Sequence, residues 1–190
     1  GIYIIIAFTF IYGAQVVQWD EKMRVLTFIT VQVTATLGAI FFGWAEDRRG
    51  SQFTYQFTLL FWIGAVLLIW QTPNITDGIN SLGYQAERQD IFLVVAVAAG
   101  LCLGATQSAS RAIVGKLTPL PRAAEFFGFW GLSHKLAAII GLVGVGLMQA
   151  LVGLQNAILL CAVFFALAFI VCLKVNLSRG QIKAGQYPRD

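Results

Sequence analysis

The chain has 190 residues, of which 58% are hydrophobic and only 12% are charged. Soluble domains carry about 25% charged residues, so this composition excludes an ordinary soluble domain and predicts an integral membrane protein with several spans. The formal net charge of +4 comes from basic residues spread over short polar segments, which is typical of membrane loops and does not indicate nucleic-acid binding.

The reactive residue types do not form a pattern that catalysis or metal binding would need. The three cysteines, Cys102, Cys161 and Cys172, lie within apolar runs without CxxC spacing, so we expect buried, unreactive thiols. The sequence has no metal-ligand cluster, no phosphate-binding loop and no nucleophile–base pairing. We therefore expect no metal, no cofactor and no enzymatic activity.

Six apolar segments predict six membrane-spanning helices. They cover residues 1–19, 23–44, 53–70, 90–114, 122–152 and 157–173. The first would be about 28 Å long at 1.5 Å per residue, just enough to cross a hydrocarbon core of about 30 Å. Residues 1–175 are thus expected to form an all-helical six-helix bundle, followed by a polar tail over residues 176–190.

Three further features of the chain lead to expectations. Gly1 is not a methionine, and we interpret the N-terminus as a boundary within a longer protein. Gln32 interrupts the second apolar segment, and we expect it to face a cavity. The stretch 71–89 is the longest polar segment between two spans and is expected to be a loop.

In the fourth segment, Gly100, Gly104 and Ser108 recur every four residues and share a helix face with Gln107 and Arg111. Small residues at this spacing allow close contact between helices. That face is therefore either a packing seam or part of a polar cavity.

Lys and Arg residues are divided unequally between the two ends of the predicted helices. Three lie at one end: Lys22, Arg24 and Arg88. Nine lie at the other end: Arg48, Arg49, Arg111, Lys116, Arg122, Lys174, Arg179, Lys183 and Arg189. Because cytoplasmic loops are enriched in Lys and Arg, we expect the second end, with the tail, to face the cytoplasm.

A short charged segment, residues 43–50, joins the second and third predicted helices. Its pattern Gly43-x-x-x-Asp47-Arg48-x-Gly50 resembles the inter-helix loop motif of the major facilitator superfamily, which recurs in each six-helix half of that twelve-helix fold. The resemblance implies that the glycines allow close approach. It also implies that Asp47 and Arg48 lock to a neighbouring helix end in one conformer and release it in the other. The alternative is an ordinary positively charged turn.

A second stretch narrows the resemblance. It contains the patterns Gln107-x-x-Ser110-Arg111, Lys116-Leu117-x-Pro119, Glu125-Phe126-Phe127-Gly128-Phe129 and Ser133-x-Lys135-x-Ala137-Ala138. These patterns resemble the vacuole effluxer family of the same superfamily, whose fungal members export amino acids from the vacuole during autophagy. The resemblance implies the C-terminal half of a twelve-helix transporter. His134 and Leu142 depart from the family pattern.

Polar and charged residues of the fourth and fifth predicted helices fall near one depth. Counted from the outer helix ends, Gln107 is about 25 Å deep, Lys135 about 27 Å and Arg111 about 31 Å. We expect these three residues and His134 to line the cytoplasmic half of a polar cavity. The alternatives are that Lys135 snorkels to the inner headgroups and that His134 is a hydrogen-bonded packing residue.

These inferences lead to one main function and one alternative. We expect the C-terminal half of a secondary active transporter that moves a small solute, such as an amino acid, by alternating access. Its partners would be the lipid bilayer, the solute, and either a missing N-terminal six-helix half or a second copy. Its location would be a bacterial inner membrane or a vacuolar membrane. The alternative is a non-transporting membrane scaffold or partner-binding protein.

Overall fold

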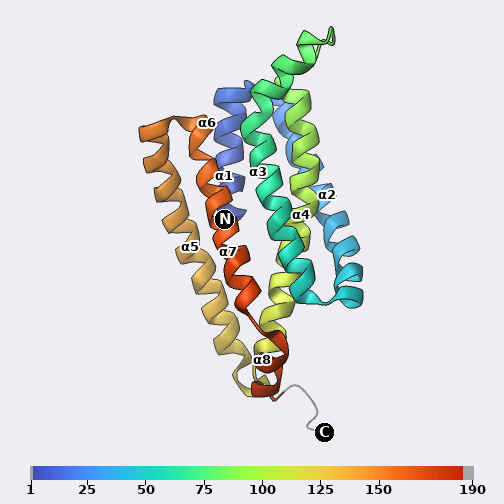
Figure 1. Cartoon of the computed structure of the whole chain (residues 1–190), viewed down its shortest axis with the longest axis vertical. Coiled ribbons are helices and arrows are strands. Elements are labelled where there is room, and N and C mark those ends of the chain that lie inside the picture. Colours follow the sequence, from blue (N-terminus) through green and yellow to red (C-terminus); the bar gives the residue numbers. More distant parts are fainter. Residues whose placement is uncertain (1, 186–190) are drawn as a thin grey trace.

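A computed structural model describes residues 2–185, and the regular structure in that range is entirely helical (Figure 1). The elements in chain order are α1 (Ile2–Tyr12), the π-helical turn η1 (Gly13–Val17), α2 (Glu21–Arg49), α3 (Ser51–Ser81), α4 (Arg88–Leu117), the 3-10 turn η2 (Leu120–Arg122), α5 (Ala123–Val152), α6 (Leu154–Ala157), α7 (Leu159–Lys174) and α8 (Leu177–Lys183). The expectation of an all-helical protein is confirmed.

Five helical segments in the described range are long and apolar enough to cross a membrane. They are Glu21–Arg49, Ser51–Ser81, Arg88–Leu117, Leu120–Val152 and Leu154–Lys174. The first predicted span is also helical, but α1 and η1 together cover only residues 2–17. A full crossing takes about 20 residues, so this segment is shorter than the other five.

The segment 43–50 was expected to be a loop, but α2 continues through it as far as Arg49. Only Gly50 separates α2 from α3, and its φ of +86° is a left-handed backbone angle that glycine adopts without steric cost. The prediction ended the second helix too early because hydropathy reports the apolar part of a helix. The helix itself continues into the polar interface.

Helix α3 also runs beyond its apolar part, and the predicted loop over 71–89 is reduced to residues 82–87. Pro73 lies inside α3 and has no backbone N–H, so the carbonyl of Ile69 lacks its usual helical donor. The Tyr12 hydroxyl of α1 donates a hydrogen bond to that carbonyl over 3.0 Å. A side chain from another helix thus replaces the donor that the proline removes, and α3 continues.

Helix α4 packs against both α2 and α3, while α3 also packs against α7 (Figure 1). Three glycines, Gly38, Gly100 and Gly104, bring α2 and α4 close together. A Cβ atom at Gly104 would collide with the backbone of Ala35, and one at Gly38 would collide with the backbone of Leu101. The small-residue face of α4 is therefore a packing seam with α2.

The indole of Trp62 on α3 links three helices in the core. It is 2% exposed, and its Nε1 donates a hydrogen bond to Thr106 Oγ1 on α4 over 2.9 Å. Its ring stacks on Phe165 of α7 with 5.5 Å between the ring centroids. This side chain therefore fixes the relative positions of α3, α4 and α7.

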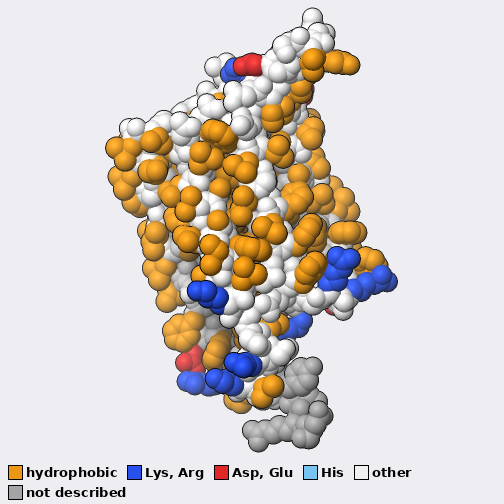
Figure 2. All heavy atoms as spheres, in the orientation of Figure 1, with side chains coloured by type: hydrophobic (Ala, Val, Ile, Leu, Met, Phe, Trp, Pro, Cys, Tyr) orange, Lys and Arg blue, Asp and Glu red, His pale blue; other side chains and the backbone are white. Residues whose placement is uncertain are grey.

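The surface of the bundle has an apolar middle and charged ends. Hydrophobic side chains cover the visible side between the two ends, and Lys and Arg gather mainly at the end where α8 lies (Figure 2). Helices α2 and α5 expose many large apolar side chains. Soluble monomers rarely expose apolar patches of more than a few hundred Å², so this belt indicates a protein surrounded by lipid or by other membrane helices.

Candidate functional site

Two of the predicted site residues, Arg111 and His134, contact the same aromatic side chain. The guanidinium carbon of Arg111 on α4 lies 5.8 Å from the ring centroid of Trp130 on α5. The His134 and Trp130 ring centroids are 4.5 Å apart, and His134 Nδ1 lies 3.0 Å from the Trp130 carbonyl oxygen. We call Arg111, Trp130 and His134 the cation cluster; it joins α4 and α5 at one level of the bundle.

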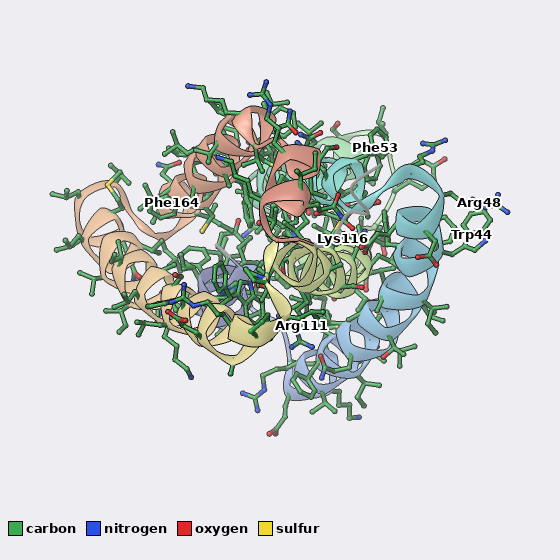
Figure 3. The ribbon with its side chains drawn as sticks, turned by 90° about the horizontal axis from the view of Figure 1, so that it is seen from below. Trp44, Arg48, Phe53, Arg111, Lys116 and Phe164 are labelled. Carbon is green, nitrogen blue, oxygen red and sulfur yellow. The ribbon has the colours of Figure 1, made fainter. Side chains whose placement is uncertain are left out.

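The cation cluster lies on an accessible face of the bundle. Arg111 is exposed, and Figure 3 shows its side chain on the side of α4 that lies between α5 and α2. A guanidinium within about 6 Å of an indole centroid is attracted to the ring face, so Trp130 can hold Arg111 in place. The sequence patterns do not single out Trp130, although its spacing of four residues from His134 puts both on one helix face.

The other predicted site residues lie apart from the cation cluster. Lys135 is exposed on α5, and the ion pairs within residues 2–185 do not include it. Gln107 is half-buried on α4, where its carbonyl accepts a hydrogen bond from Ser110 over 3.2 Å. Gln32 is exposed on α2 and lines a separate cavity. The structure therefore brings together Arg111 and His134, and the roles of Lys135, Gln107 and Gln32 stay predictions.

A cavity of about 280 Å³ lies next to His134. Four polar residues lie on its wall: Tyr55, Thr106, Ser133 and His134. The rest of the wall is apolar and includes Phe164 of α7 (Figure 3). A largely apolar chamber with a few polar groups is the usual form of a small-molecule site.

The residues of the predicted loop motif lie at the surface. Arg48 stacks on Trp44 with 3.8 Å between its guanidinium carbon and the ring centroid, and both side chains point away from the bundle (Figure 3). Asp47 is exposed, and the ion pairs within residues 2–185 do not include it. A Cβ atom at Gly43 or at Gly50 would meet no neighbour within 4 Å, so the close approach expected at these glycines does not occur within residues 2–185.

The carboxylate that connects this turn to a neighbouring helix is Glu46. It is 8% exposed, and Ser51 Oγ donates a hydrogen bond to its Oε1 over 2.5 Å. Lys116, near the end of α4, donates a hydrogen bond to Ser51 Oγ, and its Nζ lies 3.9 Å from Glu46 Oε1. We call Glu46, Ser51 and Lys116 the turn cluster, because it holds the α2–α3 turn against the end of α4.

Sequence reasoning missed the turn cluster because it followed the superfamily pattern to Asp47. A signal was available in the helical period of α2. Gly38, Phe42 and Glu46 recur every four residues, and Gly38 faces α4. A carboxylate on that face needs a cationic partner, because an unpaired buried charge is strongly unfavourable.

The bundle and its charges define the class of protein. It is an integral membrane protein, because five helical segments of the described residues are long and apolar enough to cross the bilayer. Arg111 and Lys135 lie within the apolar segments 90–114 and 122–152 of two of these helices, α4 and α5. Charged side chains within spans are energetically costly and therefore rare.

Comparison with known proteins identifies the family. Residues 1–185 match the model of the family described as "Vacuole effluxer Atg22 like", so the chain belongs to this family, as the sequence patterns predict. The chain is similar to the "Uncharacterized MFS-type transporter YxiO" of Bacillus subtilis (strain 168), with 24% identity over 172 residues. The alignment covers 90% of this chain and 37% of that relative, so the chain spans little more than a third of the relative's length. No solved structure matches the chain significantly.

Proposed function

We propose that the chain is the C-terminal six-helix half of a secondary active transporter of the major facilitator superfamily, which moves a small solute by alternating access. The observation that carries this proposal is the family match over residues 1–185. The cation cluster supports it, because it places a fixed positive charge near the end of a spanning helix, where the charge can meet a solute that enters from that side.

The pairing of helices supports the proposed fold. Helix α2 packs against α4, and α1 packs against α5. If α1–α3 and α4–α7 are two three-helix repeats, each of these contacts joins the second helix of one repeat to the first helix of the other. Inverted repeats of three helices within each six-helix half are a feature of this superfamily. The sixth span of this half would be α1 with η1.

We further propose that the solute carries a carboxylate, and amino acids are the first class to test. A guanidinium binds a carboxylate through two parallel hydrogen bonds, which suits Arg111. Lys135 and Gln107 would extend the polar path along α5 and α4, and His134 would lie beside it. The end of the bundle with α8 would face the cytoplasm of a bacterial cell or of a cell with a vacuole.

The test is uptake of radiolabelled amino acids by proteoliposomes that contain the protein expressed from its complete gene. We expect Arg111→Gln to reduce uptake at least about tenfold at equal protein level, because an unpaired carboxylate would then be desolvated without compensation. The matched control is Arg88→Gln, at the other end of the same helix, which should transport like wild type. Unchanged uptake by Arg111→Gln would remove this residue from the path. No uptake of any amino acid by wild type would favour the non-transporting scaffold.

A further inference from the structure

A second cavity, of about 100 Å³, lies between α1, α2 and α4, with walls also from α3. Most of its wall is apolar and includes Trp19, Phe28 and Trp62. Its polar residues within the described part of the chain are Thr9, Thr27 and Gln32, and none of its described wall residues is charged. This cavity shares no residue with the cation cluster.

The hydroxyl of Thr27 is buried at this cavity without a partner. Thr27 is 3% exposed, and within the described residues its Oγ1 has no hydrogen-bond partner. Two other threonines of α2 behave differently, because Thr34 and Thr36 donate to carbonyls four residues earlier, over 2.8 and 3.0 Å. Buried polar groups are nearly always hydrogen-bonded, so an unpaired buried hydroxyl on a cavity wall points to a missing partner.

We propose that this cavity binds a small neutral molecule with an apolar body and one hydroxyl group, and that Thr27 forms the hydrogen bond to that hydroxyl. At about 100 Å³ it is smaller than the apolar cavity of about 150 Å³ that holds benzene in another protein, so it has room for no more than one small ring. Ile6 and Phe28 on its wall are exposed, so the cavity is open on one side and part of such a ring can extend beyond it. Trp19 and Trp62 provide flat apolar surfaces for such a ring.

The absence of charge on the wall decides the chemical class of the ligand. A carboxylate or an ammonium group would be desolvated here without an opposite charge, which is strongly unfavourable. A purely apolar molecule would leave the Thr27 hydroxyl unsatisfied. A phenol-like ligand meets both conditions. This inference does not depend on transport, and it concerns a site other than the one at Arg111.

The experiment uses phenol and toluene as matched probes, since they differ mainly by a hydroxyl in place of a methyl group. The protein is labelled with 5-fluorotryptophan and titrated in detergent while its ¹⁹F spectrum is recorded. We expect phenol to shift the resonances of Trp19 and Trp62 saturably, while that of Trp44, which points away from the bundle (Figure 3), stays unchanged. Because the readout is local, partition of the probes into detergent does not mimic binding.

Three variants test the assignment. Thr27→Val keeps the shape of the side chain, and we expect it to weaken phenol binding about tenfold without weakening toluene binding. Thr36→Val, which removes a hydroxyl that is already bonded within α2, should bind phenol like wild type. Ala99→Phe places a ring in the cavity and should abolish binding of both probes.

Three results would overturn the proposal. One is the absence of saturable shifts at Trp19 and Trp62 with phenol in the wild-type protein, which would leave water as the partner of Thr27. The second is equal phenol affinity in wild type and Thr27→Val. The third is phenol binding that survives in folded Ala99→Phe, which would place the site elsewhere.

Discussion

Glu46 and Asp47 are neighbouring carboxylates with opposite surroundings. Glu46 is buried and belongs to the turn cluster with Ser51 and Lys116, whereas Asp47 is exposed on the outer side of the α2–α3 turn. Within this chain, therefore, Glu46 has the contacts that stabilise the turn. Asp47 is exposed and forms no ion pair within residues 2–185.

This difference gives a prediction about stability. Glu46→Gln should lower the free energy of unfolding by about 1–3 kcal/mol, because it leaves Lys116 without its carboxylate partner; the lower end applies if the partly exposed lysine turns to solvent. Asp47→Asn should change stability by less than about 0.5 kcal/mol. Thermal unfolding of the purified variants in detergent measures both effects.

The same pair separates stability from transport. If Asp47 serves as a conformational contact, Asp47→Asn should slow uptake in proteoliposomes although it unfolds like wild type. Equal losses of stability in Glu46→Gln and Asp47→Asn would contradict the assignment of the turn cluster.

A second prediction concerns Tyr12 and Pro73. Tyr12→Phe should destabilise the protein by about 1–2 kcal/mol, because the Ile69 carbonyl then loses the hydrogen bond that Tyr12 donates. In a Pro73→Ala background, residue 73 supplies a backbone N–H to that carbonyl. Tyr12→Phe should then lower the free energy of unfolding much less. A double-mutant cycle from unfolding midpoints measures the coupling. Additive effects would show that the hydroxyl does not compensate for the proline.

At the scale of helices, the sequence predicts the apolar part of each span but not its ends. The spans 23–44 and 53–70 lie inside α2 and α3, which continue for several residues into polar surroundings. Hydropathy cannot detect such extensions. The extension of α3 also depends on a hydrogen bond from Tyr12, 57 residues away in the chain. For a contact of this kind, like the one between Glu46 and Lys116, the local pattern can show which helix face a residue lies on, but the partner depends on how the helices pack.

The candidate site was predictable to a similar degree. The depth estimate from helix length favours one level for Arg111 and His134, and both contact Trp130. The depth estimate could not show toward which neighbour each side chain is directed around the helix axis. Lys135, one residue after His134, is rotated by about 100° and lies on an exposed face.

The seam between α2 and α4 gives a prediction for a whole helix pair. Gly104→Ala should reduce stability by about 1–3 kcal/mol, because the added Cβ collides with the backbone of Ala35 and the two helices must move apart. Gly128→Ala on α5 is the matched control, since no neighbour lies within 4 Å of its Cβ position. In that control, the free energy of unfolding should rise by up to about 1 kcal/mol, because alanine has a higher helix propensity than glycine. Similar unfolding midpoints for the two variants would argue against a tight seam.

At the scale of the whole molecule, the basic residues at the α8 end predict the orientation in the membrane. Green fluorescent protein fused after the last residue should fluoresce in bacterial cells, because it matures in the cytoplasm and not after export in an unfolded state. An epitope inserted at Gly83, in the connection between α3 and α4, should be reached by antibody only from the opposite side. A non-fluorescent fusion protein, together with an epitope accessible from the cytoplasm, would contradict the proposed orientation.

The single-residue joint at Gly50 has a consequence for how the length of this chain can vary in evolution. One residue inserted there would lengthen the joint and move Ser51 away from Glu46, which would break the turn cluster. The connection over residues 82–87 carries no such constraint, because it is exposed over most of its length and lies beyond the core. Among related proteins, insertions and deletions should therefore gather between α3 and α4 and be absent between α2 and α3.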